Sequence, residues 1–395
     1  MYRSKLLNDV KIPLLILKIL FICCYALFII IIVDFFCFFV LDIKAPGYNS
    51  SRFFQFNSML GHFHKPNSKG YWYRYDNGIK FYVTINNFGF SDLPRKVEKE
   101  RPRIAFIGDS ITEFWETNEQ DRGQYVMEKL LGKKFEVLNF GVRGYGTDQS
   151  YLLLKNVGIY FSPDIIVYLF CINDINDNAI SHHSGPAGFH KPYFVLDQQL
   201  PSGLRLKGYP IPENKKSYSF LKESILWIND HSFFYRRVWD SLAKKILGRR
   251  IIYSVNDNFE LRPYKVQYDK DDDNRMEVTT KIVGLLNTFA KTHGKKFIIV
   301  EGIYSPVLDN KYKEKLIAQY GDIFDFDKVT KILKDYCQKN NIEFLSLPEQ
   351  IRAKGIGVTD LLPREDTMHL NKQGILFYIK ELIDKLDKLG WLALE

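Results

Sequence analysis

Cysteine is scarce in this chain, with 5 residues among 395. Cys23, Cys24 and Cys37 fall in one apolar N-terminal segment, which leaves only Cys171 and Cys337 for the rest of the chain. Small domains that are held together by disulfides contain far more cysteine than this. We therefore expect no disulfide framework, and we interpret the last two cysteines as buried thiols of a core.

The sequence also lacks a basic block interleaved with aromatic residues, so we expect no nucleic-acid partner. The formal net charge of +9 permits attraction to anionic lipid or acidic glycan without indicating a dedicated basic site. His182, His183 and His190 are interpreted as loop histidines, because nothing near them supports a metal site. The acidic run 271–273 is interpreted as solvated rather than as a calcium loop. We predict neither a metal nor a cofactor.

What the chain does contain is enough material for one large domain or two smaller ones. Hydrophobic residues make up 46% of it and charged residues 26%, which favours a sizeable core over disorder.

The N-terminal region carries one long apolar run. Residues 13–33 contain a single charge, Lys18, and a helix needs about 20 apolar residues to cross a bilayer. Lys18 can extend to the near interface. Asp34 marks either the far interface or a costly intramembrane carboxylate, and apolar sequence continues to Leu41. We predict a transmembrane anchor within residues 1–41.

The orientation of this anchor follows from the charges beside it. Arg3, Lys5 and Lys11 precede the span, and the segment after it is less positive. The positive-inside rule then predicts a cytoplasmic N-terminus and a periplasmic or extracellular remainder. The alternative is a cleaved signal peptide, but that would have a shorter apolar core and a small-residue cleavage site, which the sequence lacks.

Residues 42–100 are predicted to be a linker followed by a hairpin. The linker is polar and aromatic and extends from 47 to about 69. Strand-like runs at 71–75 and 79–85 are joined by Asp-Asn-Gly at 76–78, a strong hairpin signal. We expect this hairpin to form a flap near the core domain.

From residue 101 to 395 strand and helix patterns alternate, which indicates a parallel sheet covered on both faces. We predict strands over 104–107, 135–139, 164–170, 296–302 and 342–347, and helices over 112–131, 148–160, 276–293, 327–340 and 371–389. The predicted fold class is therefore α/β: a three-layer α/β/α domain with a parallel five-stranded sheet, preceded by the N-terminal transmembrane helix.

Residues 175–275 interrupt this alternation as an insertion. A hairpin is predicted over 191–206, and the stretch 218–247 is amphipathic. That stretch would pack on the main domain, act as a substrate lid, or lie on a membrane surface through its basic residues.

Four polar turns lie where predicted strands end or where the last helix begins. They are Gly108-Asp109-Ser110, Asn139-Phe140-Gly141-Val142-Arg143-Gly144, Cys171-Ile172-Asn173-Asp174 and Asp366-Thr367-Met368-His369. In open α/β sheets, ligands bind at the carboxyl ends of the strands. The simplest alternative is that these residues only cap helices and form turns.

Together the four turns hold the groups that acyl transfer needs. A serine hydroxyl is a weak nucleophile and requires a base within hydrogen-bond reach. Histidine suits that role because its pKa is near neutrality, and a carboxylate can orient its other ring nitrogen. Glycine amides and an asparagine side chain can donate hydrogen bonds to the oxyanion that develops.

These four blocks resemble those of the SGNH, or GDSL, hydrolases, a family named for a Ser, a Gly, an Asn and a His. The resemblance implies that Ser110 is the nucleophile, His369 its base and Asp366 the acid that orients the base. It implies an oxyanion hole formed by the backbone amides of Ser110 and Gly141 and the side chain of Asn173. It also implies a flavodoxin-like sheet, and it covers about residues 100–175 and 276–389. Two features depart from the family pattern: Cys171 stands where the third block usually has glycine, and the insertion is long.

The resemblance and the anchor together lead us to expect a membrane-anchored serine esterase that hydrolyses O-acyl, above all O-acetyl, esters. The expected partners are an acylated cell-surface glycan or a small ester, and membrane lipid around the anchor. An alternative is an O-acetyltransferase that modifies a cell-envelope polysaccharide through the same acyl-serine. Another is a non-catalytic glycan-binding or assembly protein that retains the fold.

Overall fold

The computed structural model describes residues 14–40, 53–73, 79–181, 190–212, 232, 260–363 and 366–393. Three predictions lie outside these residues: the turn at 76–78, the loop histidines His182 and His183, and, apart from residue 232, the amphipathic stretch 218–247. The chain divides into two compact units, residues 1–48 with 217–252 and residues 49–216 with 253–395.

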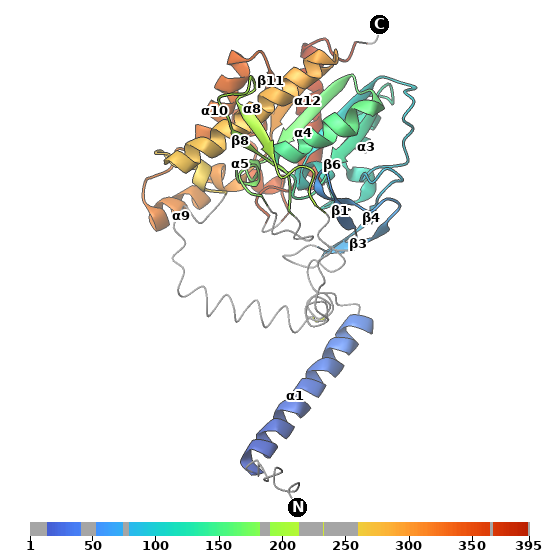
Figure 1. Cartoon of the computed structure of the whole chain (residues 1–395), viewed down its shortest axis with the longest axis vertical. Coiled ribbons are helices and arrows are strands. Elements are labelled where there is room, and N and C mark those ends of the chain that lie inside the picture. The colour runs from blue at the N-terminus through green and yellow to red at the C-terminus, as the bar shows by residue number, and fades with distance from the viewer. Residues whose placement is uncertain are drawn as a thin grey trace, which may run out of the picture. The chain divides into compact units, whose positions relative to one another are not determined.

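In the first unit, the predicted apolar helix is present as α1 (Leu14–Phe39, Figure 1). Its segment Ile16–Phe36 has a mean hydropathy of 3.0 and buries none of its residues in the protein. At 1.5 Å per residue, such a helix is about 30 Å long, which matches the hydrocarbon core of a bilayer. By length and composition, α1 is suited to be a membrane span, although a signal sequence would share both properties.

The second unit is built on a parallel sheet of five strands. They are β5 (Arg103–Gly108), β6 (Glu136–Gly141), β7 (Ile165–Phe170), β10 (Lys296–Glu301) and β11 (Glu343–Ser346), in the order β11-β10-β7-β5-β6. Numbered along the chain, this is the order 2-1-3-4-5 of flavodoxin-like sheets. Every residue of β5 and β7 is buried, as expected for central strands covered on both faces. The predicted α/β class with a parallel five-stranded sheet is confirmed, and α1 is the candidate for the predicted transmembrane helix.

Helices cover the two faces of this sheet (Figure 1). The helix α3 (Gly123–Leu130) packs against α12 (Lys372–Lys388), and α4 (Thr147–Asn156) packs against α8 (Lys270–Thr292). Right-handed crossovers put these two pairs on opposite faces. The helix α10 (Lys328–Lys339) lies beside α8. Two further helices, α9 (Asn310–Tyr320) and α11 (Leu347–Lys354), were not among the predicted helices.

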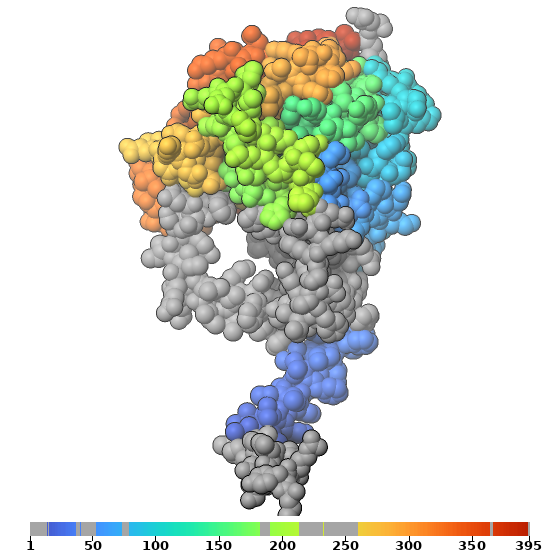
Figure 2. Space-filling model, viewed as in Figure 1, coloured from blue at the N-terminus to red at the C-terminus, as the bar shows by residue number. Residues whose placement is uncertain are grey.

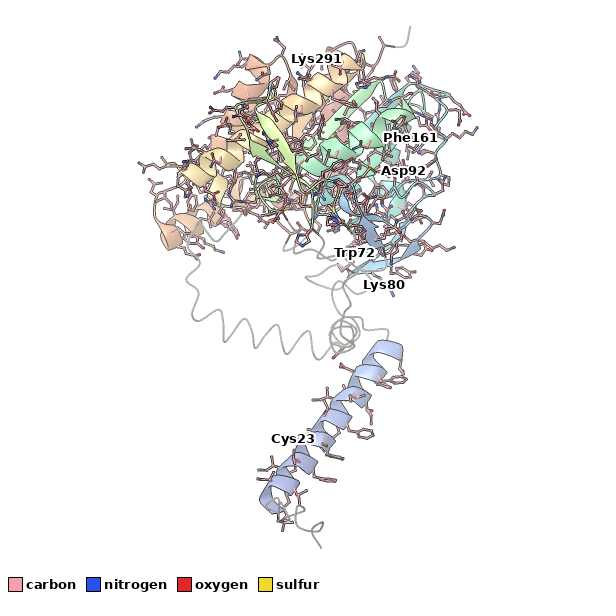
Figure 3. The ribbon with its side chains drawn as sticks, viewed as in Figure 1. Cys23, Trp72, Lys80, Asp92, Phe161 and Lys291 are labelled. Atoms are coloured by element: carbon pink, nitrogen blue, oxygen red, sulfur yellow. The ribbon has the colours of Figure 1, made fainter. Side chains whose placement is uncertain are left out.

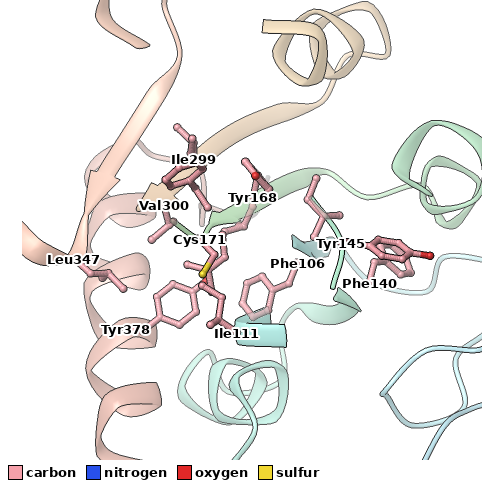
Figure 4. Packing of buried hydrophobic residues seen from close by; sticks show 14 of the residues in the cluster. Phe106, Ile111, Phe140, Tyr145, Tyr168, Cys171, Ile299, Val300, Leu347 and Tyr378 are labelled. Atoms are coloured by element: carbon pink, nitrogen blue, oxygen red, sulfur yellow. The ribbon is translucent and has the colours of Figure 1, made fainter. Parts of the chain in front are cut away.

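The buried core joins the sheet to both helical layers. Ile111, from the turn after β5, and Tyr378, from α12, lie beside Cys171 just past the end of β7 (Figure 4). Cys171 and Cys337 are both buried free thiols, as the sequence indicated.

The helix predicted over 112–131 is wrong as a continuous element. A short helix α2 (Ser110–Glu113) ends at Phe114, whose φ of +57° is left-handed, and a 3₁₀ turn at 119–121 separates it from α3. Gly123 makes room for the Phe114 ring, because a Cβ there would lie 2.5 Å from Phe114 Cζ. The break leaves Trp115 free to enter the core with no exposed surface.

The helix predicted from residue 276 begins earlier, at Lys270, because Asp269 caps its N-terminus. The acidic run 271–273 forms the first turn, where negative charge favours the helix dipole. Asp272 is only 4% exposed and is bound by Arg262 and Lys265, so the expectation that this run is solvated is wrong for Asp272.

Residues 53–64, expected to be linker, instead form a hairpin of β1 (Phe54–Asn57) and β2 (Gly61–His64). A second hairpin, β3 (Lys69–Tyr73) with β4 (Lys80–Thr84), confirms the predicted strands. Both hairpins contribute to the main core through part of their aromatic side chains. Phe54, Phe63 and Trp72 are at most 8% exposed, whereas Tyr71 and Tyr82 of the second hairpin face solvent. Trp72, labelled in Figure 3, lies with its ring centroid 5.4 Å from that of Trp115. The hairpins are therefore part of the domain surface seen in Figure 2 (blue to cyan) rather than a separate flap.

Part of the predicted insertion also packs on the domain. The hairpin of β8 (Tyr193–Leu196) and β9 (Leu204–Lys207) confirms the prediction over 191–206, and its Phe194 contacts Ile282 of α8. Just before β8, the ammonium of Lys191 donates hydrogen bonds to both oxygens of Asp148, at 2.9 and 2.7 Å. Both side chains are almost completely buried. This ion pair fastens the insertion to α4.

Removing the cation of this pair should destabilise the fold strongly. We expect Lys191→Met to lower the free energy of unfolding by about 3–5 kcal/mol, because it leaves the Asp148 carboxylate buried without a counter-charge. Adding Asp148→Asn should recover much of that loss. The measurement is urea unfolding of the full chain in detergent, followed by tryptophan fluorescence. The control is Lys388→Met, which removes an exposed pair and should change the free energy of unfolding far less than Lys191→Met does. Equal losses for the two lysine variants would contradict this role.

Candidate active site

Ser110 lies at the carboxyl end of β5, beside the point where the strand order reverses between β5 and β7. The strand ends at Gly108, where a Cβ would lie 2.2 Å from Thr112 Oγ1, so the tight turn into α2 requires glycine. Asp109 caps this helix by accepting a hydrogen bond from the Ile111 amide at 3.0 Å. The turn therefore presents Ser110 at the sheet edge where α/β proteins bind ligands.

The structure brings His369 and Asp366 to this serine, although 259 positions separate Ser110 from His369. The distance from Ser110 Oγ to His369 Nε2 is 2.9 Å. On the other side of the ring, Nδ1 donates to Asp366 Oδ1 and Oδ2, at 3.2 and 3.1 Å. Asp366 also accepts hydrogen bonds from the backbone amides of Met368 and His369, each at 2.9 Å. These two bonds fix the turn around the carboxylate.

Charges around the imidazole favour its protonated form. Burial alone would lower the pKa of His369, but the charge of Glu116 and the hydrogen bond to Asp366 outweigh burial and raise this pKa to about 9. The pKa of Asp366 is in turn held below its ordinary value, since its bonds to His369 outweigh its burial. A pKa in this range favours the imidazolium at neutral pH, the form in which both ring nitrogens of His369 carry a proton.

Glu116 is kept ionised by Arg143. Burial would raise the pKa of Glu116, yet the guanidinium of Arg143, 2.7 Å away, keeps it below the ordinary value. That guanidinium lies over the rings of Trp72 and Trp115, at 4.6 and 5.5 Å from their centroids. No sequence motif indicated Glu116, because its effect depends on charge and proximity rather than on spacing.

Two of the groups predicted for the oxyanion hole already have acceptors. The Gly141 amide donates to Asn139 Oδ1 at 2.8 Å. The Asn173 side-chain amide donates to Asp109 at 3.1 Å and to Asp177 at 2.8 Å, which uses both of its hydrogens.

Gly144, three residues beyond Gly141, differs from Gly141 in the hydrogen bonding of its amide. Its φ is +80°, and its amide donates to no residue in the described part of the chain. The sequence block contains both glycines, and the family resemblance led us to assign Gly141, not Gly144, to the oxyanion hole.

Cys171 stands at the position where the family resemblance implied a glycine. Its thiol is buried and lies 3.6 Å from Met368 Sδ, in the turn that carries His369. Burial and the neighbouring carboxylates raise the pKa of Cys171 well above its ordinary value, so it acts as packing and not as a nucleophile. Within the described ranges, no group of three or more His, Cys, Asp or Glu side chains is arranged to hold a metal ion.

We expect Glu116→Gln to lower the pH at which His369 releases its proton, because it removes a negative charge that favours the imidazolium. The measurement is an NMR titration of the full chain with labelled histidine, in which His369→Gln identifies the signal. Glu100→Gln, which changes a fully exposed carboxylate, serves as the control and should leave the titration unchanged. A midpoint that stays near 9 in Glu116→Gln would show that Glu116 does not control this proton.

A family model described as the GDSL-like lipase/acylhydrolase family matches residues 106–318, which is more than half of the chain. Ser110, Gly141 and Asn173 fall within the match, whereas Asp366 and His369 lie beyond it. No curated protein matches the sequence.

Solved structures with a similar arrangement are distant in sequence. One is a two-domain esterase active on acetylated mannans, with 12% identity and a TM-score of 0.36; the match covers 73% of this chain and 49% of that one. This chain therefore spans about half of that esterase. A carbohydrate acetylesterase family member from Sinorhizobium meliloti has 12% identity, coverages of 74% and 100%, and a TM-score of 0.35. A GDSL-like lipase from Bacteroides thetaiotaomicron has 14% identity, coverages of 75% and 92%, and a TM-score of 0.34.

At such identities and TM-scores, a shared substrate does not follow. The family match stands independently of them and spans the strand and turn that carry Ser110. Because that match covers more than half of the chain, and because the sheet has the strand order that the sequence resemblance implied, this chain belongs to the GDSL-like lipase/acylhydrolase family.

Proposed function

We propose that this chain is a serine esterase that hydrolyses O-acyl esters through an acyl-Ser110 intermediate. The observation that carries the proposal is the 2.9 Å contact between Ser110 Oγ and His369 Nε2, with Asp366 bound to the other ring nitrogen. In a family of acylhydrolases, this is the arrangement that can activate a hydroxyl and later a water molecule.

The proposed reaction starts from the neutral form of His369, which becomes more abundant as the pH rises toward its pKa of about 9. In its first half, Ser110 Oγ attacks the ester carbonyl and passes its proton to the unprotonated His369 Nε2. The tetrahedral intermediate collapses when His369 returns the proton to the leaving alcohol. In the second half, His369 takes a proton from water, the hydroxide attacks the acyl-serine, and the acid departs as Ser110 regains its proton. Asp366 holds the imidazole in position throughout and, with Glu116, stabilises the imidazolium that forms twice per cycle.

For the oxyanion we propose the Ser110 amide together with the loop 141–144. Gly141 remains the donor that the family resemblance implied, but its amide would first have to leave Asn139. The Gly144 amide has no acceptor to leave among the described residues and is therefore the better donor from this loop. Asn173 can contribute once it releases one of its two carboxylate acceptors.

We further propose that the substrate is an O-acetyl ester on a cell-surface glycan and that the domain faces the periplasm or the cell exterior. The length and composition of α1 support membrane anchoring. The positive residues that precede the span favour a cytoplasmic N-terminus and export of the domain.

Ser110→Ala should abolish both turnover and covalent labelling. We expect hydrolysis of a p-nitrophenyl acetate substrate to fall by at least about 10³-fold, because the nucleophile is lost. A fluorophosphonate probe should label the wild-type chain at Ser110 and leave the variant unlabelled. The control is Ser150→Ala: this serine is buried on α4, and its hydroxyl has no hydrogen-bond partner among the described residues. Full activity in Ser110→Ala, or a wild-type chain that neither turns over nor labels, would refute the esterase proposal.

Hydrolysis and acetyl transfer can be separated in one incubation. We expect wild-type protein given an acetyl donor and an unacetylated glycan to release acetate in excess over acetylated glycan, since a hydrolase positions water against the acyl-serine. The readout is the ratio of the two products by mass spectrometry, with Ser110→Ala as the blank. If acetylated glycan dominates, the chain is an O-acetyltransferase.

A further inference from the structure

We propose that His62, from the N-terminal hairpin, is a positioning residue for the loop that binds the oxyanion. Its role would be to hold the peptide between Arg143 and Gly144 so that the Gly144 amide stays available to the reacting oxygen. This inference rests on the proposed esterase function and assigns a part in it to a segment outside the family match at 106–318.

The contact that supports this role joins β2 to the loop after β6. His62 Nε2 lies 2.8 Å from the carbonyl oxygen of Arg143. A carbonyl only accepts, so the imidazole donates. The Arg143 carbonyl and the Gly144 N–H belong to one planar trans peptide and point in opposite directions. Holding the carbonyl toward His62 therefore turns the Gly144 amide away from the hairpin.

A tether of this kind is needed because Gly144 is conformationally free. Its φ of +80° is easily reached by glycine, and a glycine peptide can also adopt the flipped orientation at little energetic cost. A flip would present the Arg143 carbonyl where the amide now points, and a carbonyl repels an oxyanion instead of binding it.

His62 is itself held firmly. The side chain is 6% exposed, and its ring meets Tyr145 and Phe54 edge-to-face at 5.1 and 5.6 Å between centroids. The Tyr145 hydroxyl donates to the backbone carbonyl of His62 at 2.6 Å. The hydroxyl thus holds the backbone of the hairpin, whereas the burial of the imidazole and its two edge-to-face contacts, which Tyr145→Phe keeps, leave the ring little freedom to move away from the Arg143 carbonyl.

A second histidine of β2 restrains the other side of Arg143. The Arg143 amide donates to Glu113 Oε1 at 2.9 Å, and the same oxygen lies 2.6 Å from His64 Nε2. Glu113 and His64 are completely buried. His62 and His64 are two positions apart in a strand, so their side chains point to the same face of it. Thus β2 secures both peptides that flank Arg143.

The test compares full-length variants in detergent. His62→Phe keeps an aromatic ring and removes the donor. Tyr145→Phe, the matched control, removes another hydrogen bond between the same hairpin and loop without touching the Arg143 carbonyl. We expect kcat per fluorophosphonate-reactive site to fall at least about 10-fold in His62→Phe, toward the 10²–10³ that loss of one oxyanion donor costs, with KM nearly unchanged. His62→Gln, which can still donate, should restore part of the rate, and Tyr145→Phe should keep it.

A purely structural role predicts a different result: both phenylalanine variants would melt at lower temperature and keep the wild-type kcat per reactive site, which would overturn the proposal. Hydrogen exchange adds a readout that does not need activity. The Arg143 and Tyr145 amides are hydrogen-bonded in the wild type and should exchange faster in His62→Phe. Unchanged exchange would overturn the positioning role even if the wild type hydrolyses no ester. A wild type that labels nowhere would refute the esterase function alone.

Discussion

The hydrogen bond between Ser110 and His369 depends on almost every layer of the domain. Ser110 is placed by the end of a central strand, and His369 by a turn that leads into the last helix. The two meet because parallel strands present their carboxyl ends along one edge of the sheet. A second bond, from the Ser305 amide to the Thr367 carbonyl at 2.8 Å, ties the His369 turn to the segment after β10. The positions of Ser110 and His369 at this edge are thus set by the sheet as a whole.

Among the described residues around His369, carboxylates outnumber cations. Asp109, Asp366 and Glu116 all act on the imidazole of His369 or lie close to it, and Arg143 is the cation that opposes them. Such a field favours the imidazolium, the form of His369 that accompanies each tetrahedral intermediate in the proposed reaction. The same field raises the pKa of the base above neutrality. Stabilising the charged intermediate and keeping the resting base free of protons are therefore opposed requirements, and this site favours the first.

Much of the sheet could be predicted from sequence because its strands are short, mostly apolar runs bounded by turns. Ser110 could be named because it follows such a strand, and Asp366 and His369 because they lie in the turn before the last helix; the family resemblance then implied their roles. The break at Phe114 could not be foreseen, since a left-handed aromatic residue is selected by packing against Gly123. Nor could the role of residues 53–64, where the alternation is short and the partners lie more than 80 positions away along the chain.

Because the N-terminal hairpins pack into the core, the folded domain begins well before the first strand of the parallel sheet. Sequence patterns alone would place its first residue near 101, just before β5. A shortened protein cut there would lose Trp72, a partner of the Arg143 guanidinium, together with both β2 histidines. It would retain the serine, the imidazole and the carboxylate while the loop beside them went unsupported. A soluble fragment that leaves out α1 therefore has to begin ahead of Phe53.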